Sequence, residues 1–246
     1  MIYYSNLRIS DFVTLKKYKD NLYKLTYFKL PVRQSGFEIE EKIKTRCKVN
    51  DIKLDNNLIR SKSKVFELAV CNDFEYFITC TINKEKYNRY DLKTYYKDFT
   101  QFLRDYNKKY KTKIQYLFIP ERHKNGAWHI HGLIKGICPE HLIINEHGYL
   151  DWIYYRDRFG FISLSKVKDI ERVSKYITKY ITKRIDDTIN DLNLHIYYAS
   201  KGLKTAKEIK RGTLLSDSIP DFKYDFENDY VKIKWLKDDS IINCIL

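Results

Sequence analysis

Glycine, proline and cysteine are scarce in this chain of 246 residues, which contains 8 Gly, 4 Pro and 5 Cys. So few glycines and prolines exclude a collagen-like or proline-rich low-complexity protein. The cysteines are odd in number and form no C-x-x-C pair, which favours reduced structural thiols over a disulfide framework. They are Cys47, Cys71, Cys80, Cys138 and Cys244.

Long apolar segments are also missing. No apolar run approaches the ~20 residues that a membrane-spanning helix requires. The N-terminus lacks the charged-then-apolar order of a secretory signal peptide, and there is no G-x-x-x-x-G-K-[ST] sequence for a nucleotide-driven motor. We therefore expect a cytoplasmic protein with no membrane partner.

Acidic residues are too few to balance the basic ones. The chain has 46 Lys and Arg against 32 Asp and Glu, a formal net charge of +14, and 15% of its residues are aromatic. A compositional bias toward Lys, Ile, Asn and Tyr accounts for many of the lysines but not for the shortage of acids. The excess predicts a polyanionic partner, and the aromatic content favours nucleic acid over an anionic membrane surface.

The order of the predicted elements indicates an α+β fold with a central, mainly antiparallel sheet flanked by helices. Helical patterns cover residues 57–71, 91–110 and 169–184. Runs rich in β-branched and aromatic residues predict strands at 74–82, 114–121, 128–134 and 160–167, with weaker candidates at 195–204 and 229–236. We expect a domain at 57–212, an N-terminal extension of unknown role at 1–56, and a tail or extra strand at 213–246.

Two histidines, His129 and His131, stand one residue apart in the predicted strand 128–134. Because side chains alternate along a strand, both imidazoles project from one face, close enough to share a metal ion. Trp128 and Ile130 then point the other way, into a core. The alternative is two surface histidines on a half-exposed strand.

Glu121 is the best third ligand for such a metal. A three-residue hairpin loop, with Gly126 as its left-handed third residue, places Glu121 opposite His129. Two imidazoles and one carboxylate, with no thiolate, fit Mg²⁺ or Mn²⁺ acting on a phosphate. The alternative for Glu121 is a solvated carboxylate at the strand end, and His123, which shares its parity, is a reserve ligand.

Two tyrosines, Tyr176 and Tyr180, lie one turn apart on the same face of the predicted helix 169–184. They border its apolar stripe, and Lys179 and Lys183 lie on their far side. Tyrosines bordered by cations suit attack of a phenolate on a phosphate, since lysine lowers the phenol pKa or holds the phosphate. The alternative is a pair of amphipathic tyrosines at the rim of the core.

Three segments in this order, FITCTIN (77–83), WHIHGLI (128–134) and YITKYITK (176–183), resemble the motifs of HUH endonucleases. More narrowly, they resemble the two-tyrosine rolling-circle replication initiators of small bacterial phages and plasmids. The resemblance extends over about residues 57–205 and includes AVCNDFEYF (69–77) and SKGLK (200–204). It departs from the usual Thr-Leu-Thr of the first motif at Cys80, which we expect to face away from Thr79 and Thr81.

The resemblance implies an RRM-like HUH core and metal-dependent nicking and rejoining of one DNA strand through a 5′-phosphotyrosine. The residues that match the metal ligands are His129, His131 and Glu121. The residues that match the nucleophiles and their lysines are Tyr176, Tyr180, Lys179 and Lys183. The implied partners are single-stranded or hairpin origin DNA and a host helicase and polymerase, in the cytoplasm of a bacterial host cell.

Candidate DNA contacts are Arg60, Lys62, Lys64, Thr79 and Thr81, although a solvated helix face accounts equally well for the three basic residues. Several other functions remain open at this point. A relaxase or an HUH transposase would use the same chemistry, and a non-catalytic nucleic-acid-binding protein would bind DNA without reacting. A zinc hydrolase would use His129, His131 and Cys138.

Overall fold

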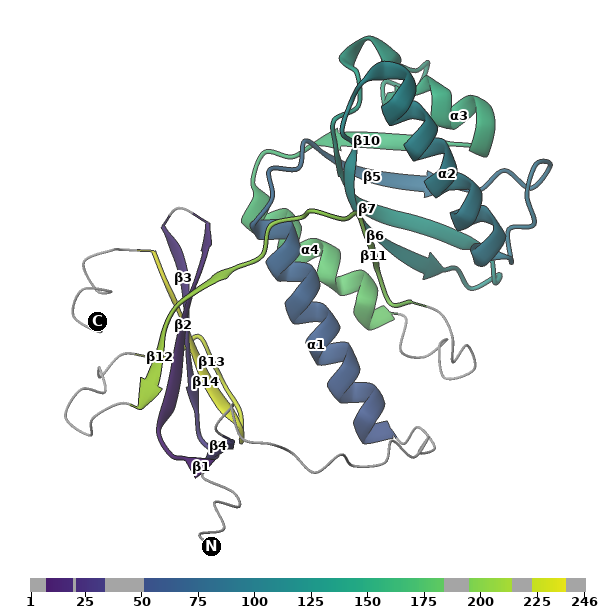
Figure 1. Ribbon diagram of the computed structural model, residues 1–246. Helices are drawn as coiled ribbons and strands as arrows, with labels where there is room; N and C mark the ends of the chain where they lie inside the picture. The colour runs from purple at the N-terminus through teal and green to yellow at the C-terminus, as the bar shows by residue number, and fades with distance from the viewer. Residues whose placement is uncertain (1–7, 20, 34–50, 184–194, 214–222, 238–246) are drawn as a thin grey trace, which may run out of the picture. The chain divides into compact units, whose positions relative to one another are not determined.

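The computed structural model describes residues 8–19, 21–33, 51–183, 195–213 and 223–237, and the chain divides into two compact units. One unit runs from Val49 to Lys204, and the other joins Met1–Lys48 to Thr205–Leu246 (Figure 1). The first unit therefore begins before residue 57 and ends before residue 212, and the two terminal segments that the sequence left separate belong together. Among the described helices, none is long and apolar enough to cross a membrane.

A seven-stranded antiparallel sheet forms the centre of the unit 49–204, with the order β11-β6-β7-β5-β10-β9-β8. The predicted α+β architecture is confirmed, and a central antiparallel sheet flanked by helices agrees with an RRM-like core. The strands are β5 (Tyr76–Thr81), β6 (Gln115–Arg122), β7 (Trp128–Lys135), β8 (Leu142–Ile144), β9 (Leu150–Trp152), β10 (Ile162–Lys166) and β11 (Tyr198–Ala199). A short 3₁₀ helix, η1 (Pro139–His141), precedes β8.

An aromatic core joins one face of this sheet to α2 (Leu92–Tyr110) and α3 (Ile153–Phe159). α2 begins after its N-cap Asp91, whose carboxylate accepts a hydrogen bond from the backbone N–H of Thr94 at 3.1 Å. Cys80 is fully buried in this core, on the side of its strand where we expected it. Other members of the core are Phe99, Phe102, Leu103, Tyr106, Trp128 and Ile130, as predicted.

The opposite face of the sheet is covered by α1 (Asp51–Val70) and α4 (Ile170–Lys183), which lie side by side (Figure 1). The predicted apolar stripe of α4 is confirmed, because Ile177 and Ile181 are fully buried against α1 and the sheet. Asp169 is the N-cap of α4, since its carboxylate accepts a hydrogen bond from the backbone N–H of Arg172 at 3.0 Å. α1 begins well before residue 57, where the sequence pattern became readable.

The hairpin of β6 and β7 has the register that the three-residue loop predicts. Glu121 pairs with His129, and the backbone N–H of His123 donates to the carbonyl of Ala127 at 2.9 Å to close the loop. Gly126 has a φ of +83°, which is the left-handed conformation expected of the third loop residue. Gly132 is also required, because a Cβ atom there would overlap the ring of Phe118 on the neighbouring strand.

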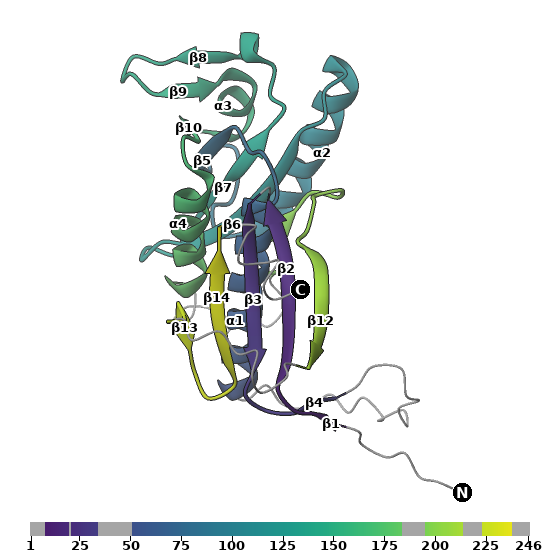
Figure 2. The ribbon, with the colours of Figure 1, turned by 90° about the vertical axis from the view of Figure 1, so that its left-hand side faces the viewer.

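The second unit contains a five-stranded antiparallel sheet with the order β12-β2-β3-β14-β13, seen face-on in Figure 2. Its strands are β2 (Phe12–Lys19), β3 (Leu22–Phe28), β12 (Lys207–Thr213), β13 (Phe226–Glu227) and β14 (Val231–Leu236), and β14 confirms the strand predicted at 229–236. Two short strands, β1 (Arg8–Ile9) and β4 (Val32–Arg33), pair separately. Leu15, Leu25 and Leu236 form its small apolar cluster.

Candidate active site

The two histidines of β7 project from the sheet face that α1 and α4 cover. In the register with β5, His131 lies opposite Thr79 and His129 lies opposite Thr81. The hydroxyl of Thr79 is 3.2 Å from Nδ1 of His131, and the hydroxyl of Thr81 is 3.4 Å from Nδ1 of His129. A threonine hydroxyl both donates and accepts, so it orients either tautomer of its imidazole partner.

Glu121 reaches the same histidines from β6. One of its carboxylate oxygens lies 2.7 Å from Nε2 of His131, and both side chains are largely buried. A carboxylate only accepts, so Nε2 carries the proton of this hydrogen bond. The ring of His123 stacks on that of His129 with their centroids 3.7 Å apart, which brings the reserve ligand to the same place.

The donor set of Glu121, His129 and His131 fits a divalent cation. Burial, reinforced by the charges of His123 and His131, lowers the pKa of His129 to about 4, so its imidazole is in the neutral, ligating form near pH 7. Within the described parts of the chain, no three His, Cys, Asp or Glu side chains stand as a ready-made metal site. His131 and Glu121 hydrogen-bond to each other instead.

Tyr176 and Tyr180 lie on the same site. Their hydroxyl oxygens are 2.8 Å apart, and the ring of Tyr180 stacks on the imidazole of His131 with centroids 4.0 Å apart and planes inclined by 14°. Phe77 of β5 contacts both tyrosine rings, at centroid distances of 5.6 and 6.4 Å. The three sequence motifs thus meet on one face of the sheet.

The two tyrosines differ in their surroundings. Tyr176 is 46% exposed, whereas Tyr180 is only 7% exposed. Burial, the hydrogen bond from Tyr176 and the charge of Glu121 raise the pKa of Tyr180 well above its usual value. The site therefore presents one accessible phenol and one that is held within the fold.

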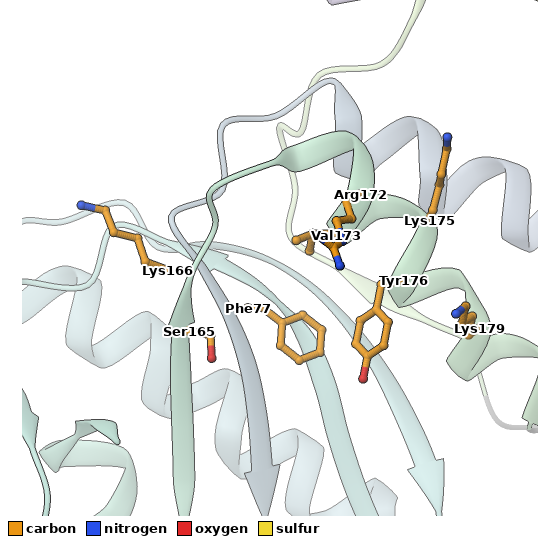
Figure 3. A pocket seen from close by; sticks show the side chains of 8 residues that line it. All are labelled: Phe77, Ser165, Lys166, Arg172, Val173, Lys175, Tyr176 and Lys179. Atoms are coloured by element: carbon orange, nitrogen blue, oxygen red, sulfur yellow. The ribbon is translucent and has the colours of Figure 1, made fainter. Parts of the chain in front are cut away.

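A pocket of about 450 Å³ opens beside Tyr176 (Figure 3). Sequence reasoning missed it, because its walls come from β5, β10 and α4 and only the pairing of β10 with β5 brings them together. The basic residues on α4 were visible in the sequence, but nothing local connects them to β10. The lining residues are Phe77, Ser165, Lys166, Arg172, Val173, Lys175, Tyr176 and Lys179.

The remaining predicted residues are placed as follows. Lys179 lies near the Tyr176 ring, with Nζ 5.9 Å from its centroid, while the side chain of Lys183 lies outside the described residues. Lys64 forms an ion pair with Glu67 of its own helix at 3.2 Å. The basic residues predicted on α1, Arg60, Lys62 and Lys64, are absent from the pocket lining, and their DNA contacts remain predictions.

Cys138 does not join the histidines. It packs against the aromatic core on the other face of the sheet, which leaves the zinc set of His129, His131 and Cys138 unassembled. The interpretation as a zinc hydrolase is therefore not supported.

Residues 75–185 match a family model for the replication-associated protein ORF2. The matched segment contains Glu121, both histidines and both tyrosines. Neither the comparison with curated proteins nor that with solved structures gives a match. The family match supports a replication-associated protein of the rolling-circle initiator type.

Proposed function

We propose that this protein initiates rolling-circle replication by nicking and rejoining one strand of its origin DNA through a phosphotyrosine. The observation that carries the proposal is the stacking of Tyr180 on His131, with the Tyr176 hydroxyl 2.8 Å from that of Tyr180. This arrangement puts a pair of candidate nucleophiles directly beside a candidate metal-ligand set. A core-rim role alone does not explain why two phenols and three metal-type ligands converge there.

In the proposed reaction, Oη of one tyrosine attacks the phosphorus of the scissile phosphodiester. A P–Oη bond forms, the bond from phosphorus to the 3′ oxygen breaks, the phenol loses its proton and the departing 3′ oxygen gains one. The 5′ end stays on the protein and the free 3′-hydroxyl primes synthesis. Because one ester replaces another, the reverse attack by a 3′-hydroxyl reseals the strand and no nucleotide cofactor is consumed.

The chain's own residues position this chemistry. Lys179, beside the Tyr176 ring, supplies positive charge to the scissile phosphate. Thr79 and Thr81 hold the orientations of the imidazoles. His129, His131 and Glu121 would hold Mg²⁺ or Mn²⁺, which when bound supplies Lewis-acid polarisation of the phosphate.

The proposed partner is single-stranded or hairpin origin DNA. The net charge of +14 favours backbone contacts, and unpaired bases are available to aromatic side chains. A host helicase would unwind the duplex ahead of a host polymerase, since the sequence has no nucleotide-driven motor motif. These steps belong in the cytoplasm of a bacterial host.

The test is a denaturing gel of the protein with labelled single-stranded DNA from its own replicon and Mn²⁺. We expect an SDS-resistant adduct that is lost with a chelator, with His129→Ala and with the double variant Tyr176→Phe/Tyr180→Phe. A matched control is Tyr110→Phe/Tyr154→Phe, since these hydroxyls also lie 2.6 Å apart but near the opposite core. Tight DNA binding without an adduct on any origin fragment would leave a non-catalytic DNA-binding protein and refute the nicking mechanism.

A further inference from the structure

The pocket beside Tyr176 has a definite position relative to the candidate metal ligands. Glu121 is on β6, the histidines are on β7, Phe77 is on β5 and Ser165 is on β10, which is also the order of these strands in the sheet. The pocket therefore extends the site along the sheet, on the side of β5 away from Glu121. A strand of DNA whose scissile phosphate lay at Tyr176 would continue into it.

The lining of the pocket matches one kind of ligand. Its cations are Lys166, Arg172, Lys175 and Lys179, all of them exposed, and it contains no carboxylate. In the portion of the chain that the structure describes, none of the four forms an ion pair with an acidic side chain. Unpaired cations around an open space attract a polyanion.

The pocket also offers aromatic surface. Phe77 and Tyr176 contribute rings that lie next to each other, edge to face, with centroids 5.6 Å apart (Figure 3). A volume of about 450 Å³ is in the range of small-ligand sites. Cations combined with aromatic rings are the composition of sites for single-stranded nucleic acid, where bases stack and phosphates meet Lys and Arg.

We propose that this pocket binds one unpaired nucleotide of the DNA strand next to the scissile phosphate. Its base lies against Phe77, and its phosphate is held by Lys166, Arg172 and Lys175. This inference rests on the proposed function, because the nick at Tyr176 fixes which nucleotide is meant. Single-stranded DNA fits better than duplex, since a paired base does not expose its face for stacking.

Base removal tests the stacking contact. The full chain is titrated in EDTA, which prevents cleavage, with fluorescent origin oligonucleotides that carry one abasic site at successive positions. We expect wild-type affinity to fall about tenfold when the abasic site occupies one position flanking the nick. Phe77→Leu binds the intact oligonucleotide more weakly and shows no further loss at that position, whereas Phe77→Trp keeps the loss.

Charge removal tests the phosphate contacts. Lys166→Ala/Lys175→Ala should lower affinity about tenfold or more at low salt, and reduce the slope of log affinity against log salt by about 1.4, or roughly 0.7 per lost contact. The matched control is Lys97→Ala/Lys108→Ala, which removes the same charge from exposed positions on α2, over the opposite face. That control should change the affinity less than threefold.

Two results would overturn the proposal: equal losses in the two double variants, or an abasic profile that is the same in wild type and Phe77→Leu. The adduct assay, run on the same preparations, separates this failure from that of the proposed function. If wild type forms the adduct and either result is found, the pocket assignment fails and the nicking proposal stands. If wild type binds DNA but forms no adduct, the nicking proposal fails and takes with it the assignment of the pocket to a nick.

Discussion

The two tyrosines are chemically identical, but the fold gives them different roles. Tyr176 is 46% exposed at the edge of a basic pocket, while Tyr180 is buried between His131 and Phe77. The raised pKa of Tyr180 means that its phenolate is disfavoured until the surroundings change. An incoming strand therefore meets Tyr176 first.

We predict that Tyr176→Phe slows the first cleavage about 100-fold or more, because it removes the accessible nucleophile. Tyr180→Phe should slow it less than about tenfold, since the hydroxyl it removes only hydrogen-bonds to the attacking one. Single-turnover adduct formation measures both rates. Equal losses in the two variants, or a larger loss in Tyr180→Phe, would contradict this order.

Thr79 acts through His131 rather than on the substrate. Its hydroxyl lies 3.2 Å from Nδ1 of the imidazole whose Nε2 faces Glu121. Hydrogen bonds of this kind fix the orientation of a metal-ligating histidine, and their loss typically weakens metal affinity by 10- to 100-fold.

We predict that Thr79→Val weakens Mn²⁺ binding about tenfold, as measured by calorimetry on the protein without DNA. Thr79→Ser keeps the hydroxyl and should bind Mn²⁺ within about threefold of wild type. Normal Mn²⁺ binding by Thr79→Val, with adduct formation still impaired, would instead favour the direct DNA contact predicted for this residue from the sequence.

At the scale of elements, local sequence signals predicted most of what builds the site. The β6–β7 register followed from the position of Gly126 in the loop, and α4 followed from its apolar stripe and the N-cap Asp169. β8, β9 and α3 were not predicted, since elements of 3 and 7 residues are too short to display a period. The pocket depends on the pairing of β10 with β5, which no local pattern specifies.

The hairpin that carries the histidines tolerates no side chain at Gly132. A Cβ atom at that position would overlap the Phe118 ring and lie 2.6 Å from the Leu117 carbonyl oxygen. We predict that Gly132→Ala destabilises the unit 49–204 by about 1–3 kcal/mol, as measured by chemical denaturation. Gly212→Ala, where the added Cβ meets nothing within 4 Å, should change stability by less than about 0.5 kcal/mol.

The whole molecule was the hardest scale to predict. The sequence indicated one domain with an extension and a tail, whereas the two ends of the chain form a second sheet, in which β2 pairs with β12 and β3 pairs with β14. Such pairings join segments that are nearly the length of the chain apart. Neither segment carries a turn or hairpin signal that names its partner.

The division into units leads to a prediction about the whole chain. Residues 49–204 contain the metal-ligand set, the tyrosine pair and the basic pocket, together with a core on each face of their sheet. The fragment 49–204 should therefore fold and form the Mn²⁺-dependent adduct with a single-stranded origin oligonucleotide, at a rate within about tenfold of the full chain. Circular dichroism checks its folding independently of activity. A folded fragment that binds the oligonucleotide but forms no adduct would show that the second sheet takes part in the chemistry, because every residue assigned to the reaction would still be present.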